Sequence, residues 1–569
     1  MSLADYLPRV EESAASLTPR SRRIRLLFIL ALHAIALVAM VRTEVGPNAL
    51  SIFLLTWALL NFFWLTVLGR PAIAALISLV VVETIIQLSY FKFEITWMTI
   101  TFLDLLIVDT DTFKFLLAVS PSLRLGLFIG AIAAIPLLVL IWKGDPFRLR
   151  RRASAAGAAG CMTIIAVLSL AVPEQPTDPF QGVNHVSSFV RSGVTAMLQL
   201  STSGWIESDP DLAGHLKSTA NDACILAKKP PHIVLVLDES SFDVTAAPGI
   251  KVPENYRDHF KSLDGRIRRL AVESTGGPTW YTEYNVLTGL SAKSFGKLMF
   301  YVTRIAADHV RRGLPQALRH CGYQTFSLYP AYGAFLNARR FQASAGVQKL
   351  YDQGEMGAND VEPDSFYYDQ AIKIIARERK KGPLFTFVYT VANHFPWDET
   401  YKPDLTPGWI PLGNTPEIDE YIRRQVMSAK DYRDFRERLA REFPDDEFLI
   451  VRFGDHQPYI SSKFIEPGRP LSEIAHHIMQ GDLRYFTTYY AIDGVNYRPA
   501  DLSDALGLLD APYLPLVVLE AAGLPLDATF AEQKTVMRRC SGLFFRCKNG
   551  AEARRFNRLL IDADLIKGL

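Results

Sequence analysis

The chain has 569 residues, a formal net charge of +2 at pH 7 and 49% hydrophobic residues. This length exceeds that of one ordinary domain, so we expect at least two. The nearly balanced charge excludes the strongly basic surface that is typical of nucleic-acid-binding proteins, and no nucleic-acid partner is expected.

Long apolar runs are concentrated before residue 175, which predicts a membrane anchor followed by a water-soluble domain. Each run is roughly 17–20 residues, long enough to cross the hydrocarbon core of a bilayer as a helix. A cleaved signal peptide is the alternative for the first run, but four more runs follow it and it lacks a clear small-residue cleavage site. We therefore predict a transmembrane domain of five helices over residues 1–173. The predicted spans are Ile24–Val41, Leu50–Leu68, Ala72–Leu88, Leu125–Trp142 and Ala156–Val172.

Basic residues give the orientation of these spans. Basic clusters precede the first span and follow the fourth, and Arg70 lies in the loop after the second. With five spans these three segments share one side of the membrane, and the positive-inside rule makes that side cytoplasmic. We therefore expect a multi-pass protein of the inner (plasma) membrane with an extracytoplasmic, periplasmic C-terminal domain. The two clusters consist of Arg20, Arg22, Arg23 and Arg25, and of Lys143, Arg148, Arg150, Arg151 and Arg152.

Two segments beside the predicted spans need separate interpretations. Residues 90–121 are apolar but carry several charges, which a sixth span would bury at considerable cost. They form either an interfacial or re-entrant segment on the outer face or a solvated loop. Residues 174–230 are predicted to be a periplasmic linker, in which Val186–Leu200 has the apolar spacing of an amphipathic helix.

The C-terminal domain, residues 231–569, has the pattern of an α/β fold. Ile233–Leu237 is a β-branched run that predicts a buried parallel strand, and three later runs repeat the pattern. Helical stretches such as 307–319 and 364–379 lie between the runs, so we expect a sheet covered by helices on both faces. The later runs are Tyr323–Leu328, Leu384–Thr390 and Phe448–Phe453.

Polar residues follow three of these four predicted strands. Glu239 comes after the first, His394 after the third, and the pair Asp455 and His456 after the fourth. Ligands bind such sheets beyond the carboxyl ends of the strands. Each of these residues alone is commonly a cap or a structural group, but carboxylates and imidazoles together are the usual ligands of divalent metals. We predict one divalent metal, Zn²⁺ or Mn²⁺, at this edge of the sheet.

The candidate nucleophile lies in the stretch Glu273–Thr282. Its two glycines and its proline predict a loop that runs into a helix from Trp280 to about Leu290, with Thr279 at the N-cap. Unpaired N–H groups at a helix start favour an alkoxide or a bound phosphate, although most threonines there are only caps. A hydroxyl is inert at neutral pH unless its alkoxide is stabilised. Thr279 as fourth ligand of a metal held by the strand-end carboxylates and His456 would meet that need.

Four segments occur in a fixed order along the chain: IVLVLDES, GGPTWYTEYNVLTGL, VANHFPWD and VRFGDHQPY. This order resembles the alkaline phosphatase superfamily, and within it the membrane-anchored lipoteichoic acid synthases and the phosphoglycerol transferases of osmoregulated periplasmic glucans. The resemblance spans essentially the whole chain, because five N-terminal helices before an extracytoplasmic sulfatase-like domain are also that family's architecture. A sulfatase proper is disfavoured, since no cysteine here is followed two residues later by the proline of the sulfatase motif.

The resemblance implies roles for individual residues. Thr279 matches the family's nucleophile, and His394 matches the histidine that contacts the phosphoryl group or the leaving oxygen. Leu336 replaces a tryptophan of the lipoteichoic acid synthases, which leaves the headgroup open, while Lys92 and Asp104 match a pattern of the glucan-type transferases and favour phosphoglycerol. The implied metal ligands are Glu239, Thr279, Asp455 and His456, and the implied substrate-binding residues are Asn337, Arg339 and Arg340, with His477 and its neighbour His476.

The predicted function follows from this site and its anchor. We expect a transferase that moves a phospho-headgroup, phosphoglycerol or phosphoethanolamine, from a membrane phospholipid to a cell-envelope glycan or a lipopolysaccharide-type acceptor. The metal-activated threonine would carry the group as a phosphothreonine diester. A monomer is expected. Two alternatives are a phosphodiester hydrolase that uses the same site and a catalytically silent envelope protein that binds glycan or lipid.

Four of the 5 cysteines lie outside the predicted spans, in a compartment where disulfides persist. Cys540 and Cys547 flank a short glycine-containing loop and are the favoured bridge. Cys224 and Cys321 each precede a predicted strand, so adjacent strands would bring them together. Four cysteines allow three connectivities, and the sequence alone does not choose among them.

Overall fold

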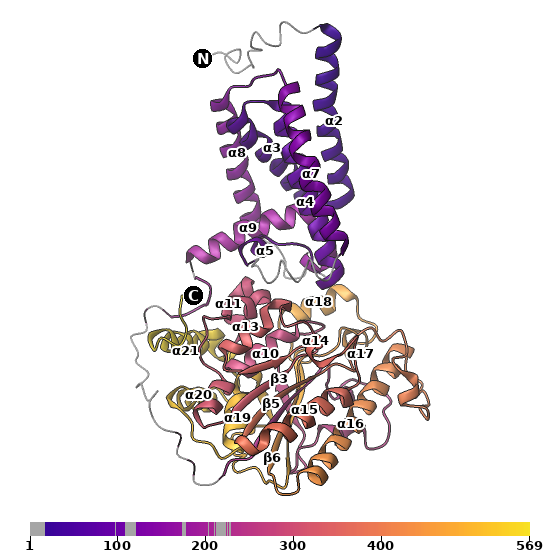
Figure 1. Cartoon of the computed structure of the whole chain (residues 1–569), viewed down its shortest axis with the longest axis vertical. Helices are drawn as coiled ribbons and strands as arrows, with labels where there is room; N and C mark the ends of the chain where they lie inside the picture. The colour runs from indigo at the N-terminus through magenta and orange to yellow at the C-terminus, as the bar shows by residue number, and fades with distance from the viewer. Residues whose placement is uncertain are drawn as a thin grey trace. The chain divides into compact units, whose positions relative to one another are not determined.

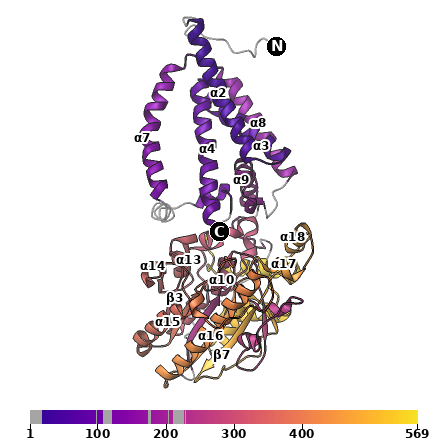
Figure 2. The ribbon, with the colours of Figure 1, turned by 90° about the vertical axis from the view of Figure 1, so that its right-hand side faces the viewer.

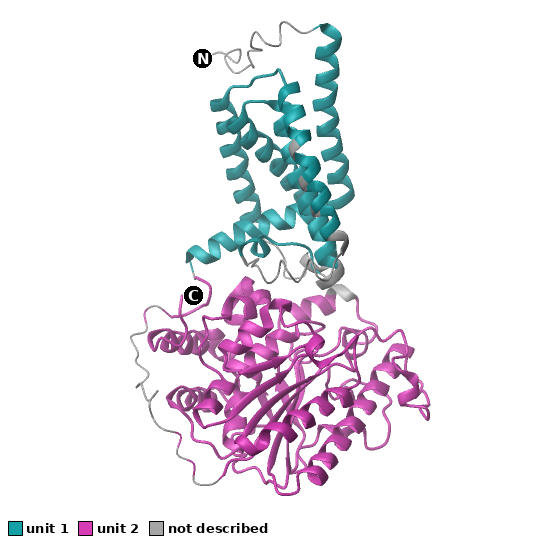
Figure 3. Ribbon diagram, viewed as in Figure 1, with its two compact units in different colours: residues 1–202 teal, residues 203–569 magenta. Residues whose placement is uncertain are grey.

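The protein is described from a computed structural model, which covers residues 18–96, 98–107, 121–172, 178–202, 204–209, 211, 224, 226 and 229–568. The chain divides into two compact units, Met1–Thr202 and Ser203–Leu569 (Figure 3). Each unit is described by itself below.

The first unit contains five helices that are long and apolar enough to cross a membrane (Figures 1 and 2). This confirms the prediction of five long apolar helices in the N-terminal part of the chain. Prolines begin the first three helices, where a missing N–H costs nothing, and Gly69 ends the second in the left-handed conformation that glycine adopts freely. The five helices are α2 (Pro19–Thr43), α3 (Pro47–Leu68), α4 (Pro71–Thr96), α7 (Pro121–Gly144) and α8 (Arg151–Ala171).

Two shorter helices complete the first unit. Helix α9 (His185–Thr202) covers the linker segment that was predicted to be helical, and Glu44 accepts a 2.9 Å hydrogen bond from the backbone N–H of Val186 in its first turn. Helix α5 (Phe102–Ile107) follows α4, and the Lys92 ammonium and the Asp104 carboxylate form a 2.8 Å ion pair between the two helices. Within the segment 90–121, predicted to be interfacial or solvated, residues 97 and 108–120 lie outside the described residues.

The second unit is built on an eight-stranded sheet with the order β4-β3-β5-β1-β6-β7-β2-β8. The strands pair in parallel except for β7, which runs antiparallel to both β6 and β2. The mixed α/β sheet confirms the predicted fold class. The strands are β1 (His232–Asp238), β2 (Arg268–Ala271), β3 (Gln324–Leu328), β4 (Lys349–Tyr351), β5 (Leu384–Thr390), β6 (Phe448–Gly454), β7 (Thr487–Val495) and β8 (Leu508–Asp510).

Strand β1 lies at the centre of this sheet, and its seven residues are all buried. Its neighbours are the other two fully buried strands, β5 and β6. The register pairs Asp238 with Thr390 on one side and with Gly454 on the other. The three central strands therefore end at the same level, and the residues that follow them lie at the same edge of the sheet.

Helices pack against the sheet and against one another. Helices α15 (Asp364–Glu378) and α16 (Pro416–Glu442) contact each other, and they also contact β5 and β7 respectively. They lie in front of the sheet in the view of Figure 1. Helix α16 buries an apolar stripe that includes Ile418, Tyr421 and Ile422, and its first turn carries two acidic residues that suit a helix N-terminus.

The remaining helices of the second unit include a contacting set formed by α10, α12 and α19. The segment 307–319, predicted as one helix, is instead a turn followed by α12, because Gly313 and Pro315 start a new helix there. The other bounds are α10 (Thr279–Thr288), α11 (Val302–Ala306), α12 (Leu314–His320), α13 (Ala338–Ser344), α14 (Gln353–Met356), α17 (Ser461–Ile465), α18 (Leu471–Met479), α19 (Leu514–Ala521), α20 (Ala528–Arg539) and α21 (Ala551–Asp562).

Two disulfides join cysteines of the second unit. Cys540 and Cys547 are bonded across the short loop, and Cys224 is bonded to Cys321 across a sequence separation of 97 residues. Both pairs are among the connectivities that the sequence allowed. Cys161, in helix α8, is a buried free thiol.

Candidate metal centre and nucleophile

Three predicted metal ligands meet beyond the ends of β1 and β6. One ligand atom from each of Glu239, Asp455 and His456 lies within 4.8 Å of the other two, and all three residues are buried. His456 Nε2 is 3.4 Å from a Glu239 oxygen and 3.2 Å from Asp455 Oδ2. Residues more than two hundred positions apart are adjacent because β1 and β6 are hydrogen-bonded neighbours with matched ends.

The hydroxyl of Thr279 completes the cluster. Thr279 Oγ1 lies 3.2 Å from Glu239 Oε2 and 3.2 Å from His456 Nε2. The predicted N-cap position is wrong by one residue, since Thr279 is the first residue of α10 and Pro278 is its N-cap. The hydroxyl still lies at the helix start, where unpaired N–H groups and the helix dipole favour negative charge.

The loop that precedes Thr279 is tied to the segment that follows His456. Gly276 donates its N–H to the carbonyl of Gln457 (2.8 Å) and has a φ of 74°, which favours glycine. Within α10, the Thr282 hydroxyl donates to the carbonyl of Asp455 (2.6 Å). These two bonds hold the nucleophile candidate and the Asp455–His456 pair in one rigid arrangement.

Burial and mutual charge set the protonation of the ligands in the metal-free protein. Burial and repulsion from Glu239 raise the pKa of Asp455 above its ordinary value. Burial alone would lower the pKa of His456, but the nearby carboxylates outweigh it and raise that pKa to about 9. Burial would raise the pKa of Glu239, yet the contact with His456 lowers it. In the metal-free protein, the protonated His456 therefore supplies positive charge beside the buried carboxylates of Glu239 and Asp455.

The donor set fits a divalent cation. Asp455 Oδ2 is a buried oxygen that accepts no hydrogen bond among the described residues, and such orphaned acceptors are costly unless a cation or a water satisfies them. Two carboxylates, one imidazole and one hydroxyl make a mixed oxygen and nitrogen set, which suits a metal such as Zn²⁺ or Mn²⁺. A cation would replace the shared proton and neutralise both acids.

His394 lies beside this cluster at the end of β5. Its charge lowers the pKa of Glu239, which places the imidazole within electrostatic reach of the metal ligands. His394 Nδ1 lies 2.8 Å from the Phe395 carbonyl, and Arg424 donates to the His394 carbonyl (2.7 Å). The Nδ1 contact orients the His394 ring, and the Arg424 bond holds the His394 backbone.

The predicted substrate-binding residues make contacts of their own. Arg339 donates to Asp352 and Glu355, each at 2.8 Å, and Arg340 donates to Asp308 at 2.6 Å. His477 lies in helix α18, and its Nδ1 is 2.7 Å from the Glu466 carboxylate. His476 contacts the side chain of Gln480, and Asn337 is buried in the left-handed turn before α13. None of these contacts involves the metal-ligand cluster.

Sequence reasoning missed residues that support the cluster. The Ser240 N–H donates to Asp455 Oδ1 (2.7 Å), and its hydroxyl donates to Glu239 (2.9 Å). The Tyr421 hydroxyl donates to the Ser240 carbonyl (2.6 Å). Ser240 has a φ of 52°, a strained value for a residue with a side chain. The sequence Asp238-Glu239-Ser240 indicated an acidic strand end, but nothing in it indicated that Ser240 would contact both Glu239 and Asp455.

Comparison with known proteins gives one family match. Residues 231–486 match the family model described as Sulfatase, a range that contains Glu239, Thr279, His394, Asp455 and His456. No curated protein matches the chain.

Several solved structures are similar to the chain at low sequence identity. Phosphoglycerol transferase GacH of Streptococcus pyogenes is 16% identical, with 62% of this chain and 91% of that chain covered and a TM-score of 0.47. Lipoteichoic acid synthase LtaP of Listeria monocytogenes is 17% identical, covering 58% and 78%, with a TM-score of 0.37. The integral membrane lipooligosaccharide phosphoethanolamine transferase EptA of Neisseria meningitidis is 12% identical, covering 84% and 96%, with a TM-score of 0.39.

Proposed function

We propose that residues 231–486, which match the Sulfatase family model, form the catalytic core of a membrane-anchored, metal-dependent transferase of phospho-headgroups. The observation that carries the proposal is the convergence of Thr279 with Glu239 and His456 at 3.2 Å. A sulfatase proper needs a cysteine or serine nucleophile at this place, whereas this chain has a threonine. The donor is a phospholipid, because the chain carries five helices that could hold the site at a membrane.

The bound cation, Zn²⁺ or Mn²⁺, would lower the pKa of the threonine hydroxyl and offset charge on the phosphoryl oxygens. Glu239, Asp455 and His456 would hold it. Thr279, already deprotonated to its alkoxide, then attacks the phosphorus of the donor in line through Oγ, so that one P–O bond forms and the bond to diacylglycerol breaks. His394, as an imidazolium, gives its proton to the leaving diacylglycerol oxygen.

The second half of the reaction reverses these roles. His394, now neutral, takes the proton of an acceptor hydroxyl on a glycan. The acceptor oxygen attacks the phosphorus, and the bond from phosphorus to Thr279 Oγ breaks. Thr279 thereby returns to its starting state. Protons balance over the two steps, since one is given to diacylglycerol and one is recovered from the acceptor. Water in place of the glycan would make the same site a hydrolase.

The remaining features of the proposal concern substrates and placement. Phosphoglycerol is the preferred headgroup, with phosphoethanolamine second, and Asn337, Arg339 and His477 are proposed headgroup contacts. The domains are proposed as a transmembrane domain at 1–173, a linker at 174–230 and a catalytic domain at 231–569. The catalytic domain is placed outside the inner membrane because the basic loops favour the cytoplasmic side. The chain is proposed to act as a monomer.

The test uses the full chain in proteoliposomes that contain phosphatidylglycerol, phosphatidylethanolamine or both. We expect diacylglycerol release that requires metal and rises when an envelope glycan is added, with the headgroup recovered on the glycan. Thr279→Ala should abolish release, whereas Thr279→Ser should retain part of it. Release that is unchanged by glycan and leaves free headgroup phosphate would identify a hydrolase. Release unaffected by Thr279→Ala would overturn the proposal.

A further inference from the structure

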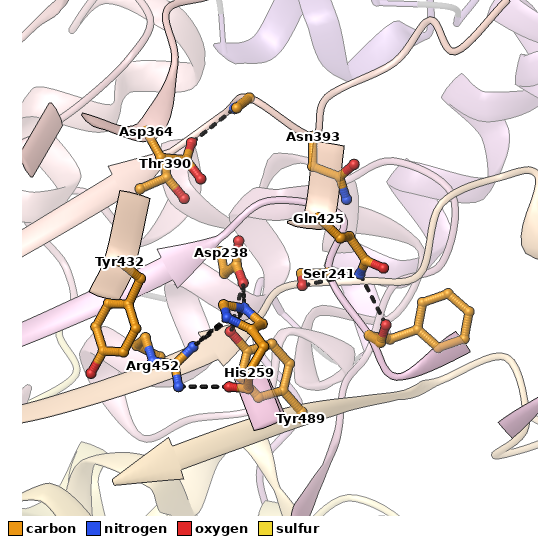
Figure 4. Close-up of polar contacts among 12 residues, drawn as sticks. Asp238, Ser241, His259, Asp364, Thr390, Asn393, Gln425, Tyr432, Arg452 and Tyr489 are labelled. Atoms are coloured by element: carbon orange, nitrogen blue, oxygen red, sulfur yellow. Dashed lines mark hydrogen bonds and ion pairs between the residues drawn. The ribbon is translucent and has the colours of Figure 1, made fainter. Parts of the chain in front are cut away.

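A second buried polar cluster includes Asp238, His259, Arg452 and Tyr489 (Figure 4). Its centre is Arg452 on β6, which is 2% exposed. We call the cluster the Arg452 network. Its members are Asp238 on β1, His259 in the short helix Tyr256–Phe260, Tyr432 on α16, Arg452 on β6, and Tyr489 and Asp493 on β7.

The Arg452 network is continuous from strand to strand. His259 Nε2 donates to Asp238 Oδ2 (3.0 Å), and the Tyr489 hydroxyl donates to the same oxygen (2.6 Å). Arg452 donates to His259 Nδ1 (3.1 Å) and to the His259 carbonyl (2.7 Å). Its guanidinium also lies 3.4 Å from Asp493 Oδ2 and 3.8 Å from the centre of the Tyr432 ring. Five structural elements are joined by these contacts.

The placement of the network ties it to the metal ligands. Asp238 immediately precedes Glu239, and Arg452 lies three residues before Asp455. Val236 pairs with Arg452, so Asp238 and Arg452 lie on one face of adjacent strands. The contacts from Arg452 through His259 to Asp238 therefore link the two strand ends from which the ligands emerge.

The segment after Glu239 is held by α16. The Gln425 amide donates to the Phe242 carbonyl (3.0 Å) and lies 3.4 Å from the Ser241 hydroxyl. His259 and Tyr489 hold Asp238 on one side of Glu239, and Gln425 holds Ser241 and Phe242 on the other. The backbone is therefore fixed on both sides of Glu239. Such clamping matters because Glu239, Asp455 and His456 must keep their ligand atoms close together to share one cation.

We propose that the Arg452 network is a positioning device that holds the Glu239 and Asp455–His456 segments at the spacing one cation requires. This inference rests on the metal role given to those ligands in the proposed function. The network also places the Asp238 carboxylate one residue before the ligand Glu239, with Arg452 joined to it through His259. Partners behind metal ligands of this kind typically contribute 10- to 100-fold to metal affinity.

A neighbouring cavity makes the proposal testable by chemical rescue. It has a volume of about 430 Å³, lies between the segment 253–260 and α16, and is lined by His259 and Gln425 among others. A ligand the size of imidazole fits such a volume. Removal of the His259 ring would therefore leave a space that added imidazole can reach, where it can contact both Asp238 and Arg452.

The experiment measures the affinity of the metal-free full chain, in detergent, for Zn²⁺ and separately for Mn²⁺. Tyr489→Phe removes one hydroxyl and keeps the ring, and we expect at least a tenfold loss of affinity. His259→Ala should show a similar loss, and imidazole should restore most of it. Arg312→Met is the matched control, because Arg312 is a buried cation that donates to Thr529 and lies outside the Arg452 network. It should lower the melting temperature and leave metal affinity unchanged.

Two results would overturn the proposal. One is unchanged metal affinity in Tyr489→Phe, and the other is a loss in His259→Ala that imidazole does not reverse. Either would mean that the network only stabilises the fold. The readout is independent of the proposed function, because no lipid or glycan is present. If the variants show the expected metal affinities but the wild-type chain transfers no headgroup, the positioning role stands and the proposed transferase activity is wrong.

Discussion

A Cβ atom on Gly454 would lie 1.9 Å from the carbonyl oxygen of Ser241. Gly454 ends β6 immediately before Asp455, and Ser241 lies two residues after Glu239. The backbone segments that carry Glu239 and Asp455 therefore lie so close together that only glycine fits at position 454.

We predict that Gly454→Ala disrupts the metal site by forcing these backbones apart. Overpacking of this kind typically costs about 1–3 kcal/mol of stability and displaces the backbone. Metal affinity and melting temperature should both fall. Gly507→Ala is the control, since a Cβ there meets nothing within 4 Å. Wild-type metal binding by Gly454→Ala would show that the close approach is dispensable.

Metal binding should stabilise the protein against heat. A cation that binds only the folded state adds about 2.7 kcal/mol when its concentration is 100 times its dissociation constant. We therefore expect the melting temperature of the chelator-treated chain to rise on titration with Zn²⁺ or Mn²⁺. Glu239→Gln removes one anionic ligand and should abolish most of the rise. An equal rise in wild type and Glu239→Gln would place the metal elsewhere.

Asp364 should make stability depend on pH. It is buried and accepts a hydrogen bond from the Ala392 N–H (3.0 Å), and burial together with repulsion from Asp238 raises its pKa from 3.8 to about 8. The folded state then binds this proton more tightly than the unfolded state. Its contribution to stability is complete below pH 3.8 and is lost as the pH rises to about 8.

Asp364→Asn tests this pH dependence, because the amide keeps the acceptor oxygen and cannot ionise. The variant should have a higher melting temperature than wild type at pH 8, and the difference should shrink towards pH 4. Asp434→Asn, which removes an exposed carboxylate paired with Lys430, is the control and should show no gain in melting temperature at pH 8. A difference that does not change with pH for Asp364→Asn would contradict the assignment.

The two disulfides should contribute unequally to stability. Bond closure constrains the unfolded chain more when the closed loop is longer, and the separations are 97 residues for Cys224–Cys321 and 7 for Cys540–Cys547. Loops of these sizes correspond to about 4–5 and about 2 kcal/mol. Denaturant unfolding of the paired alanine variants should follow that order. Equal losses would indicate that the unfolded state retains structure around the longer loop.

Much of the fold could be predicted because its signals are local. Apolar length identified the five spans, and β-branched runs identified β1, β3, β5 and β6. Strand β7 was not predicted, although all but two of its residues are buried. Its run Thr487–Val495 mixes tyrosines, threonines and an aspartate, and its antiparallel direction depends on the path of the chain after β6. Pairing between distant strands is not encoded in any short window of sequence.

The site shows the same division between local and distant information. The strand-end acids and Thr279 were predicted from position and chemistry, and the structure brings them together. The Arg452 network could not be predicted, since its members come from five elements and each appears alone in sequence as a common core or surface residue. Arg339 and His477 were predicted from the resemblance alone, and in the structure they contact the nearby carboxylates of Asp352, Glu355 and Glu466.

The most direct test of the account is mass spectrometry of the full chain after brief exposure to phospholipid vesicles and metal, without an acceptor. We predict a covalent adduct with the mass of one phospho-headgroup on the peptide that contains Thr279. The adduct should disappear when glycan is added and should be absent in Thr279→Ala. A turnover-competent enzyme with no adduct on that peptide, or with the adduct on another residue, would contradict the assignment of Thr279 as the nucleophile.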